Sequence, residues 1–217
     1  MAVSAKGLFR ATGKSANPVH VRDLISGDII LTDSLEREKD DFYPTPPEPT
    51  RAILNAELER LQDFPLIWEC AAGDGAMARE LEAVGLSVFK SDLIDRGCNA
   101  DIGSFYDYSE PKAKAILTNP PFQECNSGEW IKHAIGNLDV EYMALLLPVN
   151  WMGAMTRGGL WARYQPARVY LMRWRIDFTG QGAPPMLNAW YVWDNKIEGE
   201  TILRMLDRDD ARQGVLL

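Results

Sequence analysis

The segment Asn119-Pro120-Pro121-Phe122 brings two hydrogen-bond acceptors and an aromatic ring together, directly after a short apolar stretch. Asn119 offers a side-chain carbonyl, and Pro120 offers a backbone carbonyl that its ring holds at a fixed φ. Two acceptors around a planar amino group can accept both N–H bonds and free a delocalised lone pair. Phe122 can stack on a base, which is worth roughly 1–3 kcal/mol. The pattern predicts chemistry on the exocyclic amino group of a flipped base. The alternative is that the prolines only end a strand.

A second candidate site is the stretch 69–75, which reads ECAAGDG and joins an apolar segment to an amphipathic one. Glycine lets the chain turn sharply and lets a ligand approach the backbone closely. The stretch is neither GxGxxG nor a phosphate loop with lysine, so it suits a diphosphate poorly. Asp92 and then Asp101 follow, and an acid after the next strand can bind ribose hydroxyls. Together these features predict a nucleoside site, whereas the glycines alone would also fit a plain strand-to-helix turn.

Apolar segments typical of strands alternate with amphipathic segments typical of helices. After a proline-rich break at 43–49, strands are expected at 66–70, 86–91, 115–118, 142–147, 169–173 and 189–193, and helices at 50–62, 76–84 and 129–137. This alternation predicts an α/β domain with a mostly parallel sheet and helices on both faces. Residues 177–185 leave no room for a helix, which predicts an antiparallel pair at one sheet edge. Both candidate sites then fall beyond the carboxyl ends of strands, where such sheets bind ligands.

Length and composition are those of one globular domain, with 217 residues of which 46% are hydrophobic and 25% charged. Three cysteines without CxxC spacing and only two histidines predict neither a disulfide framework nor a metal site. The apolar run 142–149 is too short to cross a bilayer, and no signal peptide is visible. We therefore expect a protein of a reducing, cytoplasmic setting with no membrane attachment.

The charge is unevenly distributed along the chain, whose net charge is −8. Residues 36–110 carry 17 acidic and 7 basic side chains, whereas residues 142–176 carry no acid. The second stretch interleaves arginines with tryptophans and tyrosines, a combination that suits phosphates and stacked bases. We expect Arg157, Arg173 and Arg175 to bind the substrate there. The alternative is that the aromatic side chains fill the core and the arginines face water.

From about residue 41 to residue 195, these motifs resemble the class I S-adenosylmethionine-dependent methyltransferases, and most closely the small N6-adenine DNA methyltransferases of phages and prophages. The resemblance implies a Rossmann-like fold with a seven-stranded, mostly parallel sheet, and S-adenosylmethionine as cofactor. Its catalytic residues would be Asn119, Pro120, Pro121 and Phe122. The residues implied to bind the cofactor are Tyr43, Thr45, Pro46, Glu69, Ala71, Gly73, Gly75, Asp92, Leu93, Asp101, Ile102 and Asn119.

The resemblance also implies individual roles. The stretch 43–54 would close over the methionine end of the cofactor, Asp92 would bind the ribose, and Asp101 with Ile102 would hold the adenine. Phe122 and, from a late hairpin, Phe178 would contact the target base. The implied reaction methylates the exocyclic amino group of a flipped adenine in DNA without a metal.

The expected organisation is an arm or cap at 1–40 and a catalytic domain at 41–217, without a separate target-recognition domain. Specificity is then expected from short loops, from residues 1–40, from a homodimer or from a separate specificity subunit. Duplex and single-stranded DNA are both expected partners, and the acidic composition leaves RNA open as well. A phage origin would place the protein in the cytoplasm of a bacterial host.

Other functions fit the same motifs. Methylation of adenine in RNA is one. Methylation of a glutamine amide in release factors is another, since those enzymes use a similar NPPY motif, although residues 1–40 are too few for their usual N-terminal helical domain. A non-catalytic binding module of this fold is the third. A nicotinamide-dependent dehydrogenase is disfavoured because GxGxxG is absent and NPPF is present.

Overall fold

A computed structural model describes residues 19–22, 29–32, 42–178 and 186–208. The chain divides into two compact units, residues 1–43 and 44–217. In the first unit, β1 (Val19–Arg22) pairs antiparallel with β2 (Ile29–Thr32). The expected role of residues 1–40 as an arm or cap stays a prediction.

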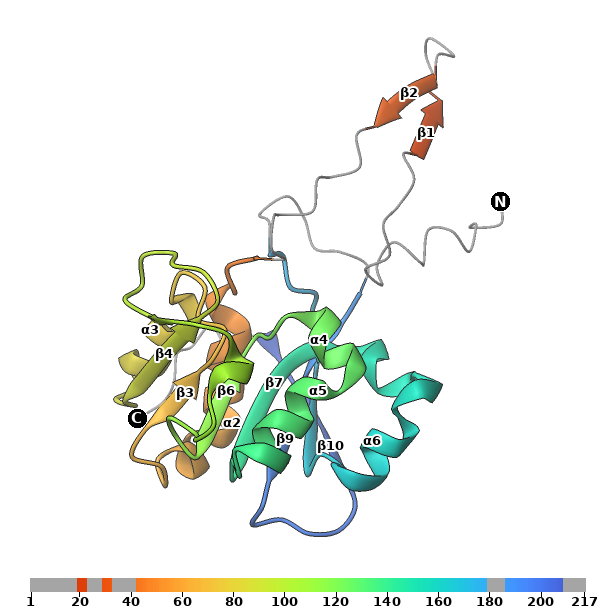
Figure 1. Cartoon of the computed structure of the whole chain (residues 1–217). Coiled ribbons are helices and arrows are strands. Elements are labelled where there is room, and N and C mark those ends of the chain that lie inside the picture. The colour runs from red at the N-terminus through yellow and green to blue at the C-terminus, as the bar shows by residue number, and fades with distance from the viewer. Residues whose placement is uncertain (1–18, 23–28, 33–41, 179–185, 209–217) are drawn as a thin grey trace. The chain divides into compact units, whose positions relative to one another are not determined.

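The second unit is built on one eight-stranded sheet with the order β10-β8-β9-β7-β6-β3-β4-β5 (Figure 1). Its strands are β3 (Ile67–Glu69), β4 (Val88–Asp92), β5 (Asp101–Ile102), β6 (Ala115–Thr118), β7 (Tyr142–Pro148), β8 (Arg168–Met172), β9 (Asn188–Asp194) and β10 (Ile202–Leu206). Strand β9 runs antiparallel to both of its neighbours, and every other adjacent pair in this sheet is parallel. The carboxyl ends of β3, β4, β6 and β7 therefore lie at one end of the sheet.

Helices and short helical turns cover the two faces of the sheet. They are α2 (Pro47–Leu61), α3 (Ala76–Ala83), η2 (Phe105–Asp107), α4 (Phe122–Ser127), α5 (Glu129–Ile131), η3 (Lys132–Asn137), η4 (Val149–Gly153), η5 (Met155–Arg157) and α6 (Gly158–Arg163). Helices α2 and α3 pack on one core cluster, with Ile53, Leu54 and Leu81 fully buried. Helices α5 and α6 and the turn η3 pack on the other, with Trp130, Ile131 and Leu160 buried. The predicted α/β sheet with helices on both faces is confirmed.

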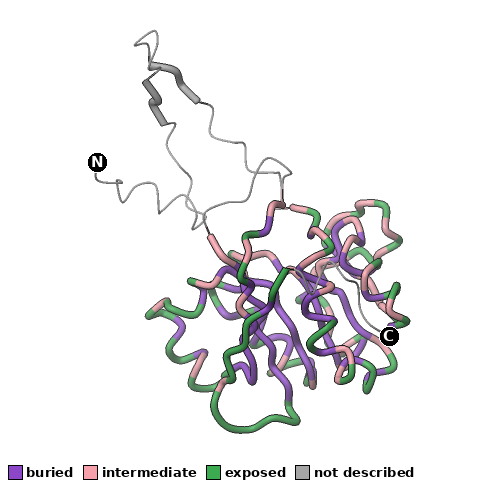
Figure 2. The backbone as a smooth tube through the Cα atoms, turned by 180° about the vertical axis from the view of Figure 1, so that it is seen from behind, coloured by how far each residue is buried: buried purple, intermediate pink, exposed green. Residues whose placement is uncertain are grey.

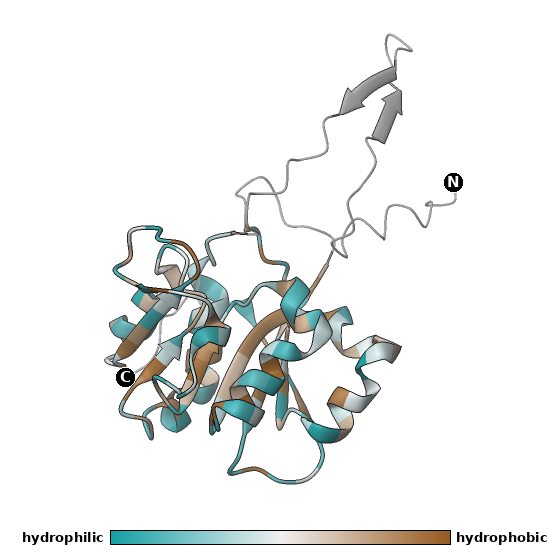
Figure 3. Ribbon diagram, in the orientation of Figure 1, coloured by the Kyte–Doolittle hydropathy of each residue, from teal (hydrophilic) through white to brown (hydrophobic). Residues whose placement is uncertain are grey.

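The strands carry the core. Seven consecutive residues of β7 are buried, as are seven of β9, and Figure 2 shows the buried tube running through the middle of the sheet. Figure 3 shows the same strands as the hydrophobic part of the ribbon, with hydrophilic residues on the outer faces of the helices. A strand buried on both faces reads as a continuous apolar run rather than an alternating one, which is why β7 was recognisable in the sequence.

Two expectations about the sheet need correction. The sheet has eight strands rather than seven. Strands β8 and β9 do form the predicted antiparallel pair, but β10 adds a parallel strand outside it and is the sheet edge. Four of the five residues of β10 are exposed, so neither burial nor alternation marks this strand in the sequence.

The proline-rich break is also shorter than expected. Helix α2 begins at Pro47 and includes Pro49, whereas the sequence pattern predicts a helix only from residue 50. Both prolines lie in the first turn, where backbone N–H groups have no partner within the helix and proline costs little. The proline segment therefore starts the helix.

Two absences concern the described residues alone. None of their helices combines the length and the apolar composition that crossing a bilayer requires. Nor do three or more His, Cys, Asp or Glu side chains among them gather into a group that could hold a metal ion.

Candidate active site

The amide of Asn119 is the most unusual polar group at the carboxyl end of the sheet. Asn119 follows the last residue of β6, and its Nδ2 donates to Thr45 Oγ1 at 3.0 Å. This hydrogen bond fixes which way the amide points. The other amide atom, Oδ1, is buried and has no hydrogen-bond partner among the described residues. A buried carbonyl without a donor costs free energy, on the order of 1–3 kcal/mol, unless a ligand supplies one.

The rest of the NPPF segment turns the chain from strand into helix. Pro121 is the N-cap of α4, and Phe122 is its first residue. Phe122 is half-buried and packs against the core cluster beneath α5 and α6. Pro120 is buried. Strand β6 ends at Thr118, directly before this segment, and the same turn places Asn119 and Phe122 close together in the chain.

The glycine loop connects β3 to α3 in a conformation that requires glycine. Gly73 and Gly75 both have positive φ, at 57° and 78°. A Cβ on Gly75 would lie 2.9 Å from the Cβ of Cys98, closer than real side chains approach. Gly75 is also the N-cap of α3, so the loop presents the start of that helix at the carboxyl end of β3.

Glu69 ends β3 inside the core. Its side chain is buried, and its Oε2 has no hydrogen-bond partner among the described residues. Burial raises the pKa of the Glu69 carboxyl well above its usual value, and the Asp92 and Asp74 carboxylates raise it further, against a hydrogen bond from the backbone of Ala78. The Glu69 carboxyl can therefore accept a hydrogen bond from a ligand, or donate one when it is protonated.

Asp92 holds the glycine loop in place. Its Oδ2 accepts from the Gly73 amide at 2.7 Å, and its Oδ1 accepts from the Ile94 amide and from Arg96 Nη1, both at 2.9 Å. The resemblance implies that Asp92 binds the cofactor ribose, which stays a prediction, and the structure shows in addition that Asp92 bonds to the glycine loop. Arg96 is a further residue at this site that the sequence pattern misses.

Beyond β4 and β5, apolar side chains are exposed beside an acid. Leu93, directly after β4, is 66% exposed, and Ile102, the last residue of the neighbouring strand β5, is 49% exposed. Asp101, paired in register with Ser91, accepts a hydrogen bond from the Tyr108 hydroxyl at 2.9 Å. The expected cofactor residues of these two strands therefore lie side by side.

Of the other expected cofactor residues, Thr45 is the Asn119 partner described above, and Pro46 is the N-cap of α2. Tyr43 and Ala71 are half-buried.

The expected substrate residues are not brought together. Arg157 is buried, and its guanidinium donates to Trp151 O, Asn126 O and Asn126 Oδ1, so its hydrogen bonds are used inside the domain. Arg173 is exposed and paired with an acid, Asp207.

Arg175 is exposed. Phe178 packs against the core cluster under α2 and α3, whereas Phe122 packs against the other cluster. Part of the loop that follows Phe178, residues 179–185, lies outside the described residues.

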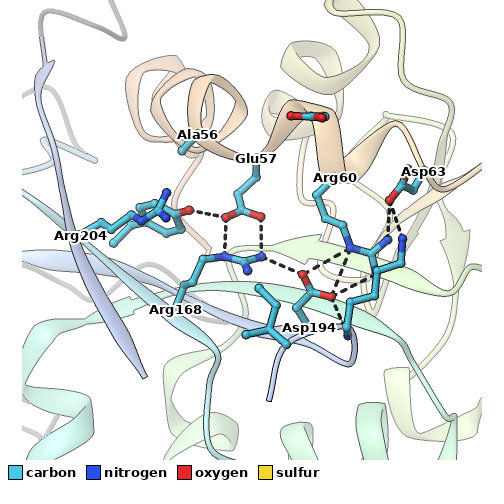
Figure 4. A pocket seen from close by; sticks show the side chains of 11 residues that line it. Ala56, Glu57, Arg60, Asp63, Arg168, Asp194 and Arg204 are labelled. Atoms are coloured by element: carbon cyan, nitrogen blue, oxygen red, sulfur yellow. Dashed lines mark hydrogen bonds and ion pairs between the residues drawn. The ribbon is translucent and has the colours of Figure 1, made fainter. Parts of the chain in front are cut away.

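A second polar cluster lies at the opposite end of the sheet, around a cavity of about 370 Å³ (Figure 4). Arg168, at the start of β8, donates to both oxygens of Glu57 at 2.7 and 2.8 Å and to Asp194 Oδ2 at 2.9 Å. Arg60 donates to Asp194 Oδ1 at 3.1 Å, and the Tyr170 hydroxyl donates to Glu57. All of these groups have partners, so the cluster reads as a structural tie between α2 and the sheet.

Comparisons with known proteins find similarity in structure but not in sequence. No family model matches the sequence, and no curated protein matches it. Solved structures do match. A protein of Listeria monocytogenes assigned to the class I S-adenosylmethionine-dependent methyltransferases has a TM-score of 0.52 at 13% identity, over 75% of this chain and 65% of that one.

Two further matches are also described as methyltransferases. An RNA methyltransferase of Pyrococcus horikoshii has a TM-score of 0.54 at 11% identity, over 74% of this chain and 88% of that one. A methyltransferase subunit of a type I restriction-modification system from Streptococcus thermophilus has a TM-score of 0.52 at 14% identity, over 76% of this chain but only 47% of that one. The second unit of this chain therefore has the Rossmann-like fold of the class I methyltransferases.

Proposed function

We propose that this protein transfers a methyl group from S-adenosylmethionine to the exocyclic amino group of a flipped adenine in DNA. The observation that carries the proposal is the Asn119 amide, whose Nδ2 is bonded to Thr45 and whose Oδ1 is buried without a partner. An acceptor that is oriented and unsatisfied is suited to a ligand N–H.

The chemistry follows from the properties of an aromatic amine. Its lone pair is delocalised into the ring, which makes it a poor nucleophile. Asn119 Oδ1 and the Pro120 carbonyl can each accept one N–H bond, which draws the nitrogen toward a tetrahedral geometry and frees the lone pair. Phe122, three positions later, supplies the face on which the base stacks. Holding the reacting atoms in line supplies much of the rate increase.

The residues around the glycine loop fit the proposed cofactor. Leu93 and Ile102 offer exposed apolar surface for a flat ring, and Asp101 lies beside them as an acceptor for its amino group. The unpartnered Oε2 of Glu69 is a further polar contact for a ligand bound above Gly73 and Gly75. When bound, S-adenosylmethionine supplies an electrophilic methyl group on a sulfonium, so neither a metal nor a covalent enzyme intermediate is required.

The choice of DNA adenine rests on the NPPF motif and on the kinds of protein that share the fold. The matched structures include an RNA methyltransferase and a subunit of a restriction-modification system, both of which support a nucleic-acid substrate. A homodimer and a separate specificity subunit stay predictions. Methylation of RNA adenine or of a glutamine amide is the alternative outcome of the experiment below.

The experiment is transfer of labelled methyl from S-adenosylmethionine to duplex DNA, single-stranded DNA, RNA and a release factor, followed by digestion to identify the product. We expect N6-methyladenine from DNA. Asn119→Ala should reduce turnover by about 10²-fold or more, as removing one preorganised catalytic hydrogen bond does, while cofactor binding persists. Asn195→Ala, an exposed asparagine beyond β9, is the matched control and should be unchanged. Label in protein alone, or equal loss of cofactor binding in Asn119→Ala, would refute the proposal.

A further inference from the structure

The segment that follows β7 lies beside the NPPF motif. Strands β6 and β7 are parallel neighbours, with Thr118 paired to Leu145. Strand β7 continues for three more residues to Pro148 and leads into η4 and η5. Because adjacent parallel strands end at the same end of the sheet, residues 149–157 leave the sheet next to Asn119.

This segment is tied to helix α4, which begins at Phe122. The Trp151 indole Nε1 donates to Cys125 O at 3.1 Å, inside α4. Arg157 Nε donates back to Trp151 O at 2.7 Å, and its Nη1 donates to Asn126 Oδ1 at 3.0 Å. The Arg157 guanidinium also lies 5.1 Å from the centre of the Trp151 ring. Arg157 thus acts as a positioning residue that holds the segment against the helix of the NPPF motif.

Helix α6 packs closely against the junction between α4 and α5. A Cβ on Gly128, between α4 and α5, would lie 2.9 Å from Leu160 Cδ1 of α6, and Gly128 has a φ of +79°. Glycine adopts this backbone conformation without strain and leaves room for this close approach. Since η5 leads directly into α6, the short segment is held at Trp151, at Arg157 and by the helix that follows.

Between these ties, the segment presents apolar side chains to solvent. Met155 is 98% exposed, and Met152, four residues after Pro148, is 38% exposed. The surrounding stretch, residues 142–176, contains no acid, and Arg163 on α6 is exposed. Apolar side chains on a supported segment whose own stretch of chain carries arginines and no acid suit a stacked, anionic polymer better than an acidic or a purely apolar partner.

We infer that Met155 enters the base stack of duplex DNA and fills the space that the flipped adenine leaves. Apolar side chains, methionine among them, insert between base steps in proteins that deform duplexes. The flipped state is otherwise disfavoured because its neighbouring bases lose their stacking. This inference rests on the proposed function and adds to it that the substrate is duplex DNA and that residues 149–157 open it.

The test compares methyl transfer to one unmethylated DNA as a duplex and after heat denaturation into single strands, using the full chain. Met155→Ala should lower kcat/KM on duplex by about tenfold or more and on single strands by less than about twofold, because unpaired bases need no help in leaving the stack. Met155→Leu keeps an apolar side chain and should retain duplex activity. Met205→Ala, an exposed methionine on β10, is the matched control and should leave both activities unchanged.

The outcomes separate this inference from the proposed function. If Met155→Ala loses equally on duplex and single strands, Met155 is a general contact for substrate or for a protein partner, and the inference is wrong. No loss on either substrate overturns it too. Activity of the unchanged chain on single strands alone overturns the inference and leaves the proposed function intact. Absence of transfer to any nucleic acid overturns both.

Discussion

Polar and charged side chains are buried at both ends of the sheet. At one end the buried charged groups have hydrogen-bond partners, and at the other end several buried acceptors have none. At the amino end of the parallel strands, Arg168 donates to both Glu57 oxygens and to Asp194. At the carboxyl end, Glu69 Oε2, Thr118 Oγ1 and Asn119 Oδ1 are buried without partners among the described residues. The first arrangement satisfies its own charged groups, whereas the second leaves acceptors free to bind a ligand of the kind that we propose.

Electrostatics follow the same division. Burial raises the pKa of the Asp194 carboxyl, but hydrogen bonds from Arg60 and Arg168 outweigh it and lower the pKa overall. Burial also lowers the pKa of Arg168, and its bonds to Glu57 and Asp194 outweigh that effect and raise it. Glu69 has no such partner, and its pKa is raised by burial. Where each charge has a partner the charged state is favoured, and where it has none the neutral state is favoured.

The largest expected effect tests the satisfied end. Arg168→Met removes both ion pairs of Arg168 and leaves the Glu57 carboxylate, 4% exposed, without its cation. Breaking a buried pair from one side typically costs about 3–5 kcal/mol of unfolding free energy. Denaturant unfolding of the full chain measures this loss, and Arg163→Met, at an exposed arginine on α6, is the matched control.

A double variant sharpens the same measurement. Arg168→Met with Glu57→Leu removes the unpaired charge, so it should regain much of the stability lost in Arg168→Met. If the single variant costs less than about 1 kcal/mol, water reaches the cavity around this cluster and the cluster is not the tie between α2 and the sheet that we describe.

The sequence predicted the buried elements better than the exposed ones. Strand β6 has the bounds expected of residues 115–118, and β7 differs by one residue, because both are continuous apolar runs. Strand β10 was missed because it is an exposed edge whose side chains follow no period. Helix α2 starts before the predicted helix because proline breaks a helix interior but is accepted in the first turn.

The candidate site divides in the same way. Motif spacing predicts that Asn119, Gly73 and Asp92 lie at one end of the sheet, since each follows a strand. Local sequence patterns do not predict which side chains form hydrogen bonds across long distances in the chain. Thr45 bonds to Asn119 from 74 positions away, and Arg157 is directed to Asn126 rather than to substrate. Such contacts depend on how separate elements pack.

A smaller effect tests the orientation of the Asn119 amide. Thr45→Val keeps the shape of the side chain and removes the only described acceptor for Asn119 Nδ2. The amide can then turn, so we expect kcat to fall about tenfold, equivalent to about 1.4 kcal/mol, with KM for the cofactor nearly unchanged. Thr45→Ser keeps the hydroxyl and should restore activity. A loss in Thr45→Ser equal to that in Thr45→Val would show that packing, and not the hydrogen bond, holds the amide.

The smallest expected effect concerns Glu69, and it tests whether burying this carboxyl at the carboxyl end of the strands lowers the stability of the fold. Because the folded pKa of Glu69 lies above its unfolded value, the folded state holds the proton more tightly, and stability falls as pH rises from about 4.5 toward the folded pKa. Glu69→Gln lacks this titration. Its Tm should therefore exceed that of the unchanged chain by more at pH 8 than at pH 5, as thermal unfolding at the two pH values measures.

The matched variant for this measurement is Glu110→Gln, which replaces an exposed carboxylate in the same way and should shift Tm little at either pH. If Glu69 is a contact for the cofactor, Glu69→Gln should also bind S-adenosylmethionine more weakly while being the more stable protein. A variant that gains stability and keeps its full affinity would instead make Glu69 a buried acid with no ligand to satisfy it. The contrast between the two ends of the sheet would then rest on Thr118 and Asn119.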